Sequence, residues 1–249
     1  MSDLPPYLSL SERIWYYAFR ILCGAIFFFL VFPLVVIIPL SFNAVPFFTF
    51  TKEMLAFDPA GYSLKWYEDF FTNLNWQGAV QNSVIIAIFS TLISTTLGTL
   101  AALGLSRAQM PYRTLIMSIL ISPMIVPLII SAAGMFFFYS RIGIQGTHIA
   151  VILAHAALGT PFVVITVTAT LSGFDNNLIR ASSSLGAPPS TTFFKVIVPL
   201  ITPGVISGAL FAFITSFDEV VVVLFVGSYR QRTCLLYTSP SPRDLSTSR

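Results

Sequence analysis

The chain has 249 residues, of which 55% are hydrophobic and only 9% charged, and its mean hydropathy is +0.83. Soluble domains carry about a quarter charged residues, so the composition excludes a soluble protein and predicts an all-α polytopic protein of the lipid bilayer. The net charge of +3 with scattered basic residues argues against nucleic acid as a partner. The two cysteines form no disulfide framework and no cluster has metal-ligand spacing, so we expect neither a metal nor a cofactor.

The first part of the chain is predicted to hold a leader, one membrane crossing and a large loop. Residues 1–20 form a polar, partly aromatic leader, and Ile21–Leu40 is an apolar run of 20 residues, which is long enough for one crossing. A signal peptide has a shorter apolar core, so we expect this helix to be retained. The loop Ser41–Gly78 is rich in aromatic residues such as Trp66 and Tyr67, which fits an interfacial belt or a partly folded cap.

Four further apolar runs bring the predicted number of crossings to five. They cover Ala79–Leu105, Leu115–Tyr139, Ile149–Leu171 and Val196–Val226. The first of these runs contains small residues such as Ser90, Ser94 and Gly98, which let helices approach closely. The second contains Pro123 and Pro127, which predict a kink.

Basic residues indicate which ends of the crossings face the cytoplasm. If the crossings alternate, the leader, the basic turn from Arg107 to Arg113 and the segment with Arg180 and Lys195 share one face. The large loop then lies on the other face. Because Lys and Arg favour cytoplasmic loops, we expect a multi-pass protein whose N-terminus and basic turn are cytoplasmic.

The segment between the last two runs, Leu178–Pro199, is polar and is interrupted by Gly186, Pro188 and Pro189. Prolines and unsatisfied backbone groups exclude a lipid-exposed crossing here. We therefore expect a short helix, a turn at the glycine and a second helix that re-enters the membrane. This surface is accessible to a partner in the aqueous phase, and an ordinary connecting loop is the alternative.

The same segment resembles the cytoplasmic loop motif of permease subunits in binding-protein-dependent ABC importers. That motif reads E-A-A, three residues, Gly, nine residues and then I-x-L-P. Here Arg180-Ala181-Ser182, Gly186 and Val196–Pro199 hold the corresponding positions, with Arg180 in place of the glutamate and Ser182 in place of the second alanine. The resemblance covers most of residues 60–232. The SFDEVVV run at Ser216–Val222 is similar to spermidine/putrescine-type permeases, in particular the second of their two permease subunits.

This resemblance implies the fold of a type I ABC-importer permease in the bacterial inner membrane, with five of an expected six crossings present. It implies that residues of about 176–195 couple to ATPase subunits, and that the chain works with a second permease subunit and a periplasmic or extracellular solute-binding protein. The residues that the resemblance assigns to ATPase coupling are Arg180, Ala181, Ser182, Ser183, Leu185, Gly186 and Pro199. The chain has no G-x-x-x-x-G-K-[ST] stretch, so we expect no enzymatic activity of its own and ATP hydrolysis by a separate subunit.

Two acidic residues, Asp218 and Glu219, interrupt the last apolar run. Ionisable residues within membrane helices usually face a cavity, a partner or a transport route. Because polyamines are cations, these carboxylates and Thr215 are candidates for the substrate path. Glu219 is preferred because Thr215 precedes it at helical spacing, and a solvated helix end or a structural partner to arginine is the alternative.

Four other polar residues have structural interpretations. His148 and His155 lie about two turns apart, at the start of and within the helix predicted over Ile149–Leu171, where an interfacial residue and a helix-packing hydrogen bond are favoured over a proton relay. Asn82 and Ser83 are interpreted as a cap at the start of the second crossing, with an outer vestibule as the alternative.

The C-terminal residues differ in composition from the rest. Cys234–Asp244 (CLLYTSPSPRD) resembles the translation of one reading frame of a common sequencing adapter, so we interpret 233–249 as an artefactual tail with no helix of useful length. A natural disordered terminus is the alternative. The transmembrane permease domain is then expected to span 21–232, with a sixth helix missing.

The expected function is an ATP-driven importer of polyamine or a similar small solute, and two other classes of function are alternatives. An ion-gradient-driven secondary transporter of a small cationic solute fits the intramembrane acids, but its inverted repeat is not visible. An intramembrane enzyme, such as a protease, lacks support because no Ser/His/Asp set, paired catalytic aspartates or HExxH motif occurs.

Overall fold

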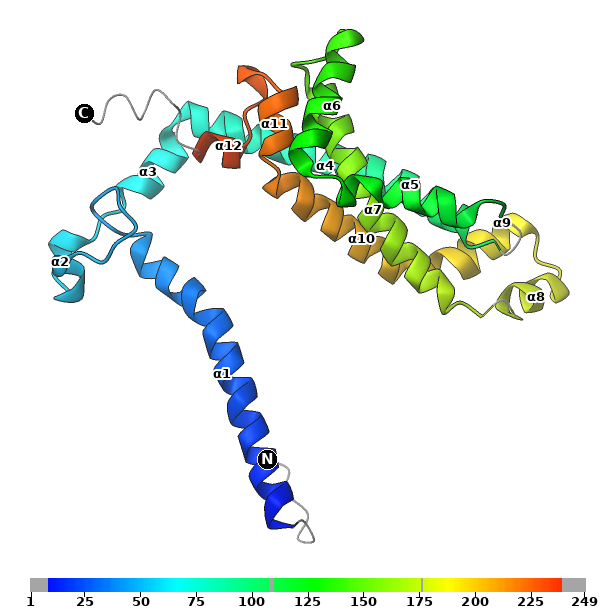
Figure 1. The fold of residues 1–249 in the computed structure, drawn as a ribbon, viewed down its shortest axis with the longest axis horizontal. Coiled ribbons are helices and arrows are strands. Elements are labelled where there is room, and N and C mark those ends of the chain that lie inside the picture. The colour runs from blue at the N-terminus through cyan, green and yellow to red at the C-terminus, as the bar shows by residue number, and fades with distance from the viewer. Residues whose placement is uncertain (1–8, 108–109, 176, 239–249) are drawn as a thin grey trace. The chain divides into compact units, whose positions relative to one another are not determined.

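The structure is a computed structural model that describes residues 9–107, 110–175 and 177–238, and Figure 1 shows its helices. The chain divides into two compact units, Met1–Asn73 and Leu74–Arg249. The division lies within the predicted loop Ser41–Gly78. The domain boundary predicted from the sequence lies at Arg20. Helix α1 (Leu10–Leu40) runs through that predicted boundary without a break, and residues 1–8 of the predicted leader lie outside the described residues.

The first unit consists of α1 and a small folded cap at its C-terminal end. Helix α1 begins at a capping box, in which the Ser9 side chain accepts from the Glu12 backbone and the Glu12 carboxylate accepts from Ser9. Its residues are exposed or at most half-buried, as expected for a helix that faces lipid. The cap contains α2 (Lys52–Leu55), the 3₁₀ turn η1 (Pro59–Gly61) and α3 (Lys65–Thr72). The prediction of a partly folded aromatic cap agrees with this arrangement.

The second unit is built around α4 (Leu74–Leu105), α7 (His148–Ser172) and α10 (Val198–Asp218), which pack against one another. Small residues make these contacts close, as predicted for the second crossing. A Cβ atom added to Gly98 would lie 2.7 Å from Cβ of Val163, and one added to Gly208 would lie 2.8 Å from Cα of Val163. Larger side chains at either glycine would force these helices apart.

The predicted crossing Leu115–Tyr139 is broken rather than kinked. Helices α5 (Arg113–Ile125) and α6 (Leu128–Arg141) meet at 102°. Pro127 has no backbone N–H and forces the preceding Val126 into an extended conformation, with ψ of 133°, so the helix ends there. Among the described residues four helices are long and apolar enough to cross a membrane, and a fifth span exists only if α5 and α6 count as one.

The last predicted crossing is also shorter than expected. Helix α10 ends at Asp218, Glu219 is extended, and a separate helix α11 (Val221–Val226) follows. The polar segment before α10 contains α8 (Asn177–Ser184), α9 (Pro189–Thr192) and the π-helical turn η2 (Phe193–Ile197). Figure 1 shows α8 and α9 at one end of the second unit and α11 at the other.

The start of the predicted tail forms a short helix. After the 3₁₀ turn η3 (Tyr229–Gln231), the five-residue helix α12 (Cys234–Thr238) packs against α4. The Cys234 N–H donates to Ser83 Oγ at 2.8 Å, and the rings of Trp76 and Tyr237 lie 4.7 Å apart. Residues 239–249 lie outside the described residues, and the adapter interpretation stays a prediction.

Candidate functional site

The predicted coupling segment forms a helix, a glycine turn and a second helix, as the sequence predicts. Helix α8 ends in a Schellman motif, in which the Gly186 N–H donates to Ser183 O at 3.0 Å and the Ala187 N–H donates to Ser182 O at 3.1 Å. Gly186 has a φ of +78°, a left-handed conformation that residues with a Cβ atom adopt only at a cost. The turn that separates α8 from α9 therefore depends on this glycine.

A buried side-chain contact fixes α8 against α9. Ser182 and Thr192 share a hydrogen bond of 2.6 Å between their hydroxyls, and Thr192 is buried. The other predicted coupling residues point outward: Arg180, Ala181 and Ser183 on α8 are exposed, and Leu185 is 88% exposed. The segment is thus a projection with a small-residue surface, on which Leu178 and Leu185 are exposed large apolar side chains.

Pro199 lies in the first turn of α10, directly after the π-helical turn η2. It is exposed, and the π-helical turn η2 connects it to the projection. The described segment is therefore continuous from α9 through η2 to the membrane helix.

The three substrate-path candidates lie at the opposite end of α10. Thr215 is half-buried, Asp218 is exposed at the last helical residue, and Glu219 is only 9% exposed. The Glu219 carboxylate accepts the Val222 N–H at 3.0 Å and so caps the start of α11. The interpretation that Glu219 continues the helical face of Thr215 is wrong, because the helix ends one residue before it. A role of these residues in the substrate path stays a prediction.

A buried hydrogen-bond network joins the three central helices near that end. Ser216 of α10 accepts a hydrogen bond from Ser90 Oγ of α4 at 2.9 Å and lies 2.8 Å from Nδ1 of His155 on α7. His155 is 2% exposed, and among the described residues its Nε2 has no hydrogen-bond partner. The expected helix-packing role of His155 is therefore confirmed. Ser216 was missed because a serine in an apolar run gives no sign of which helix it faces.

Asn82 does not cap α4, because that helix begins at Leu74. Its side-chain amide donates to the backbone oxygens of Arg230 at 2.8 Å and Arg232 at 3.0 Å, and its oxygen lies 3.0 Å from Nε2 of His148. Asn82 thus ties the loop after α11 to the starts of α4 and α7. No local pattern reveals a contact across about 150 residues, so the sequence could not predict it.

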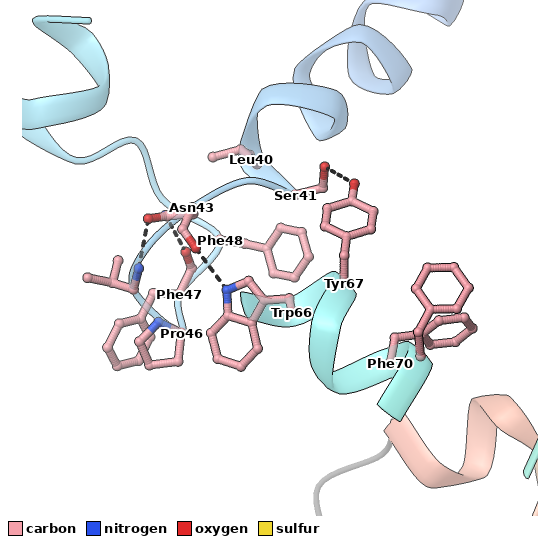
Figure 2. A pocket seen from close by; sticks show the side chains of 11 residues that line it. Leu40, Ser41, Asn43, Pro46, Phe47, Phe48, Trp66, Tyr67 and Phe70 are labelled. Atoms are coloured by element: carbon pink, nitrogen blue, oxygen red, sulfur yellow. Dashed lines mark hydrogen bonds between the residues drawn. The ribbon is translucent and has the colours of Figure 1, made fainter. Parts of the chain in front are cut away.

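The cap and the end of α1 line an open pocket of about 680 Å³, whose side chains Figure 2 shows. Hydrogen bonds around Asn43 hold its wall: the side-chain amide donates to Phe47 O and Thr49 O, and the backbone oxygen accepts from Trp66 Nε1 at 2.8 Å. A further hydrogen bond of 2.7 Å joins the hydroxyls of Ser41 and Tyr67. Most of the lining is apolar and aromatic: Leu40, Val45, Pro46, Phe47, Phe48, Trp66, Phe70 and Phe71.

Comparisons with known proteins agree with this architecture. The solved structure of a bacterial ABC transporter involved in the import of the acidic polysaccharide alginate has a TM-score of 0.71 to this chain. The match covers 98% of this chain and 88% of that one at 15% sequence identity, so it shows a shared fold. The predicted all-α ABC-importer permease fold is thereby confirmed.

Curated relatives are more similar in sequence. The spermidine/putrescine transport system permease protein PotC of Haemophilus influenzae is 32% identical over 201 residues, which cover 81% of this chain and 75% of the relative. The PotC protein of Escherichia coli K12 is 32% identical over 202 residues, covering 81% and 74%. The putrescine transport system permease protein PotI of the same strain is 28% identical over 207 residues, covering 80% and 71%.

A family model supports the family assignment in addition to the single relatives. The model described as binding-protein-dependent transport system inner membrane component matches residues 94–239, and this range contains α7, the projection at Gly186 and α10. The matched range is more than half of the chain. This protein therefore belongs to the family of binding-protein-dependent transport system inner membrane components.

Proposed function

We propose that this chain is the permease subunit of an ATP-driven importer that moves polyamine, or a similar small cationic solute, into the cytoplasm. The names of the PotC and PotI relatives support the solute class. The chain itself supplies the membrane route, and a separate subunit hydrolyses ATP. A second permease subunit and an external solute-binding protein complete the assembly.

One observation carries the coupling role: a polar projection interrupts the apolar chain between α7 and α10. The bond between Ser182 and Thr192 and the turn at Gly186 give it one shape, while Ser183 and Leu185 remain exposed. Small residues allow a close approach by a partner, and Leu185 supplies an apolar anchor. A preformed surface pays little conformational entropy on binding, so it suits docking to the ATPase.

The proposed orientation follows from this docking surface. The basic turn around Arg107 and Arg113 lies between the end of α4 and the start of α5, and the projection lies between α7 and α10. Both are proposed to face the cytoplasm, with the N-terminus. Asp218 then lies on the external side, where its exposed carboxylate would attract a cationic solute.

Site-directed cross-linking tests the coupling surface. With Cys23 and Cys234 replaced by serine, a cysteine at Ser183 is expected to cross-link to the ATPase subunit in the assembled importer. A cysteine at Ser228, which is also exposed but lies next to η3 at the other end, is the matched control and is expected to give no such product. Failure of the Ser183 variant to capture the ATPase would refute the docking role.

A transport measurement separates the ATP-driven importer from an ion-driven carrier. Uptake into vesicles is compared between importers with an active ATPase subunit and with one that cannot hydrolyse ATP. We expect uptake to stop with the inactive ATPase. Uptake that continues and follows an imposed ion gradient would instead show a secondary transporter.

A further inference from the structure

The aromatic pocket of the first unit lies next to the end of α1, an exposed apolar helix that is long enough to cross a membrane. Helix α1 ends at Leu40, and both Leu40 and Ser41 line the pocket. Large apolar residues of α1 are exposed along its length, among them Phe28, Leu34 and Ile38. The pocket therefore adjoins an apolar helix surface that suits the hydrocarbon core of a bilayer.

The depth of the pocket in the bilayer follows from the length of the apolar run. Ile21–Leu40 has 20 residues. At about 1.5 Å per residue it spans about 30 Å, which is the thickness of the hydrocarbon core. At its start, the Arg20 guanidinium bonds to the Tyr16 hydroxyl, a basic and aromatic pair typical of the headgroup level. Ser41 then marks the opposite boundary, where acyl chains meet their polar ends.

The lining fits an acyl chain better than a charged group. Its volume of about 680 Å³ lies in the range of ligand-binding pockets, about 300–1,000 Å³. The polar atoms at its edge, the hydroxyls of Ser41 and Tyr67, bond to each other. None of the described lining residues carries a charge. The nearby Lys65 ammonium bonds to the Ala44 backbone oxygen and lies 4.6 Å from the centre of the Trp66 ring.

The walls of the pocket are held in place before any ligand arrives. Trp66 and the Phe47 turn are both bonded to Asn43, which is itself buried, and Tyr67 stacks on Phe42 with ring centres 5.2 Å apart. Phe48 and Trp66 both line the pocket, as Figure 2 shows. A wall fixed in this way lowers the entropy lost on binding.

We propose that this pocket is a binding site for an acyl chain of a membrane phospholipid, with the lipid's polar end near Ser41 and Tyr67. Because no charged side chain lines the pocket in the described structure, the site does not select headgroups by charge. Its occupant tethers the cap to the bilayer boundary. The inference requires only that α1 crosses the membrane, so it is independent of the solute and of the ATPase.

Photo-labelling in the assembled importer tests this site. The complex is placed in phosphatidylcholine bilayers that contain a phospholipid with a photoreactive group at the end of one acyl chain, and labelled peptides are identified by mass spectrometry. We expect labelling of residues 41–71 that exceeds, per residue, the labelling of the lipid-facing helix α1.

A pocket-filling variant provides the comparison. Val45 lines the pocket, so Val45→Trp is expected to lower labelling of residues 41–71 to the per-residue level of α1 and to leave labelling of α1 unchanged. Val35→Trp, on the exposed side of α1, is the matched control and should alter neither. Co-purification of the other subunits verifies that both variants assemble.

Three results would overturn the proposal. Labelling of the cap no stronger than that of α1, and insensitive to Val45→Trp, would mean that only bulk lipid touches it. Cross-links from the cap to a neighbouring protein subunit in place of lipid would mean that protein fills the pocket. Labelling that depends strongly on an anionic carrier lipid and disappears in high salt would show headgroup recognition instead of acyl-chain binding.

Discussion

Replacement of Gly186 by valine tests whether the shape of the projection transmits the work of the ATPase. The residue has a φ of +78°, and an added Cβ would meet no described atom within 4 Å, so the cost arises from the backbone and not from a clash. A residue with a Cβ atom pays about 1–2 kcal/mol in this conformation. The Schellman turn would then be populated about 5–30-fold less relative to other conformations.

Solute uptake and ATP hydrolysis measured in the same proteoliposomes provide the readout. We expect Gly186→Val to assemble and hydrolyse ATP, but to import about 5–30-fold less solute for each ATP consumed. Gly186→Asn is the matched control, because asparagine adopts the left-handed conformation with less strain, and it should retain most of the coupling. Normal coupling in the valine variant, or an equal loss in both variants, would refute the reasoning.

Three further predictions concern the packed helices and the acidic end of α10. Ser216→Ala removes the centre of the buried network and should cost about 1–3 kcal/mol, seen as a lower unfolding midpoint of the purified complex. Gly208→Ala should destabilise by about 1–3 kcal/mol because its Cβ would meet a backbone atom, whereas Gly104→Ala, which has space in the described structure, should not. Asp218→Asn should lower uptake at subsaturating solute about twofold to fivefold. Glu219→Gln keeps an oxygen to cap α11 and should have little effect on uptake. Equal effects of the two variants would contradict the proposal that Asp218, and not Glu219, attracts the solute.

The positions of the membrane helices could be predicted because each long apolar run is a local property of the chain. The turn at Gly186 was predictable for the same reason, since only a few residues decide its conformation. The residues at which the helices end were harder to predict. Pro123 and Pro127 both suggested a kink, but Pro123 lies inside α5, and only Pro127 ends a helix. Tolerance of a proline depends on its neighbours in space, which periodicity does not report.

The contacts that build the sites were mostly beyond prediction because they join distant segments. Trp66 could be identified as an interfacial aromatic residue, but its bond to the Asn43 backbone, which closes the pocket, depends on how the cap folds. Glu219 looked like one more residue of a long helix, and its carboxylate instead begins a new one. In both cases a single long-range or capping hydrogen bond decided the geometry.

The unbroken stretch from Pro189 to Asp218 has a mechanical consequence. It contains 30 residues. At about 1.5 Å per residue, it reaches about 45 Å from the projection to the acidic end. In the proposed importer, a displacement of the projection would be transmitted along this one helical stretch to its end at Asp218. The wide turn η2 and the prolines Pro199 and Pro203 are the points at which the stretch can bend.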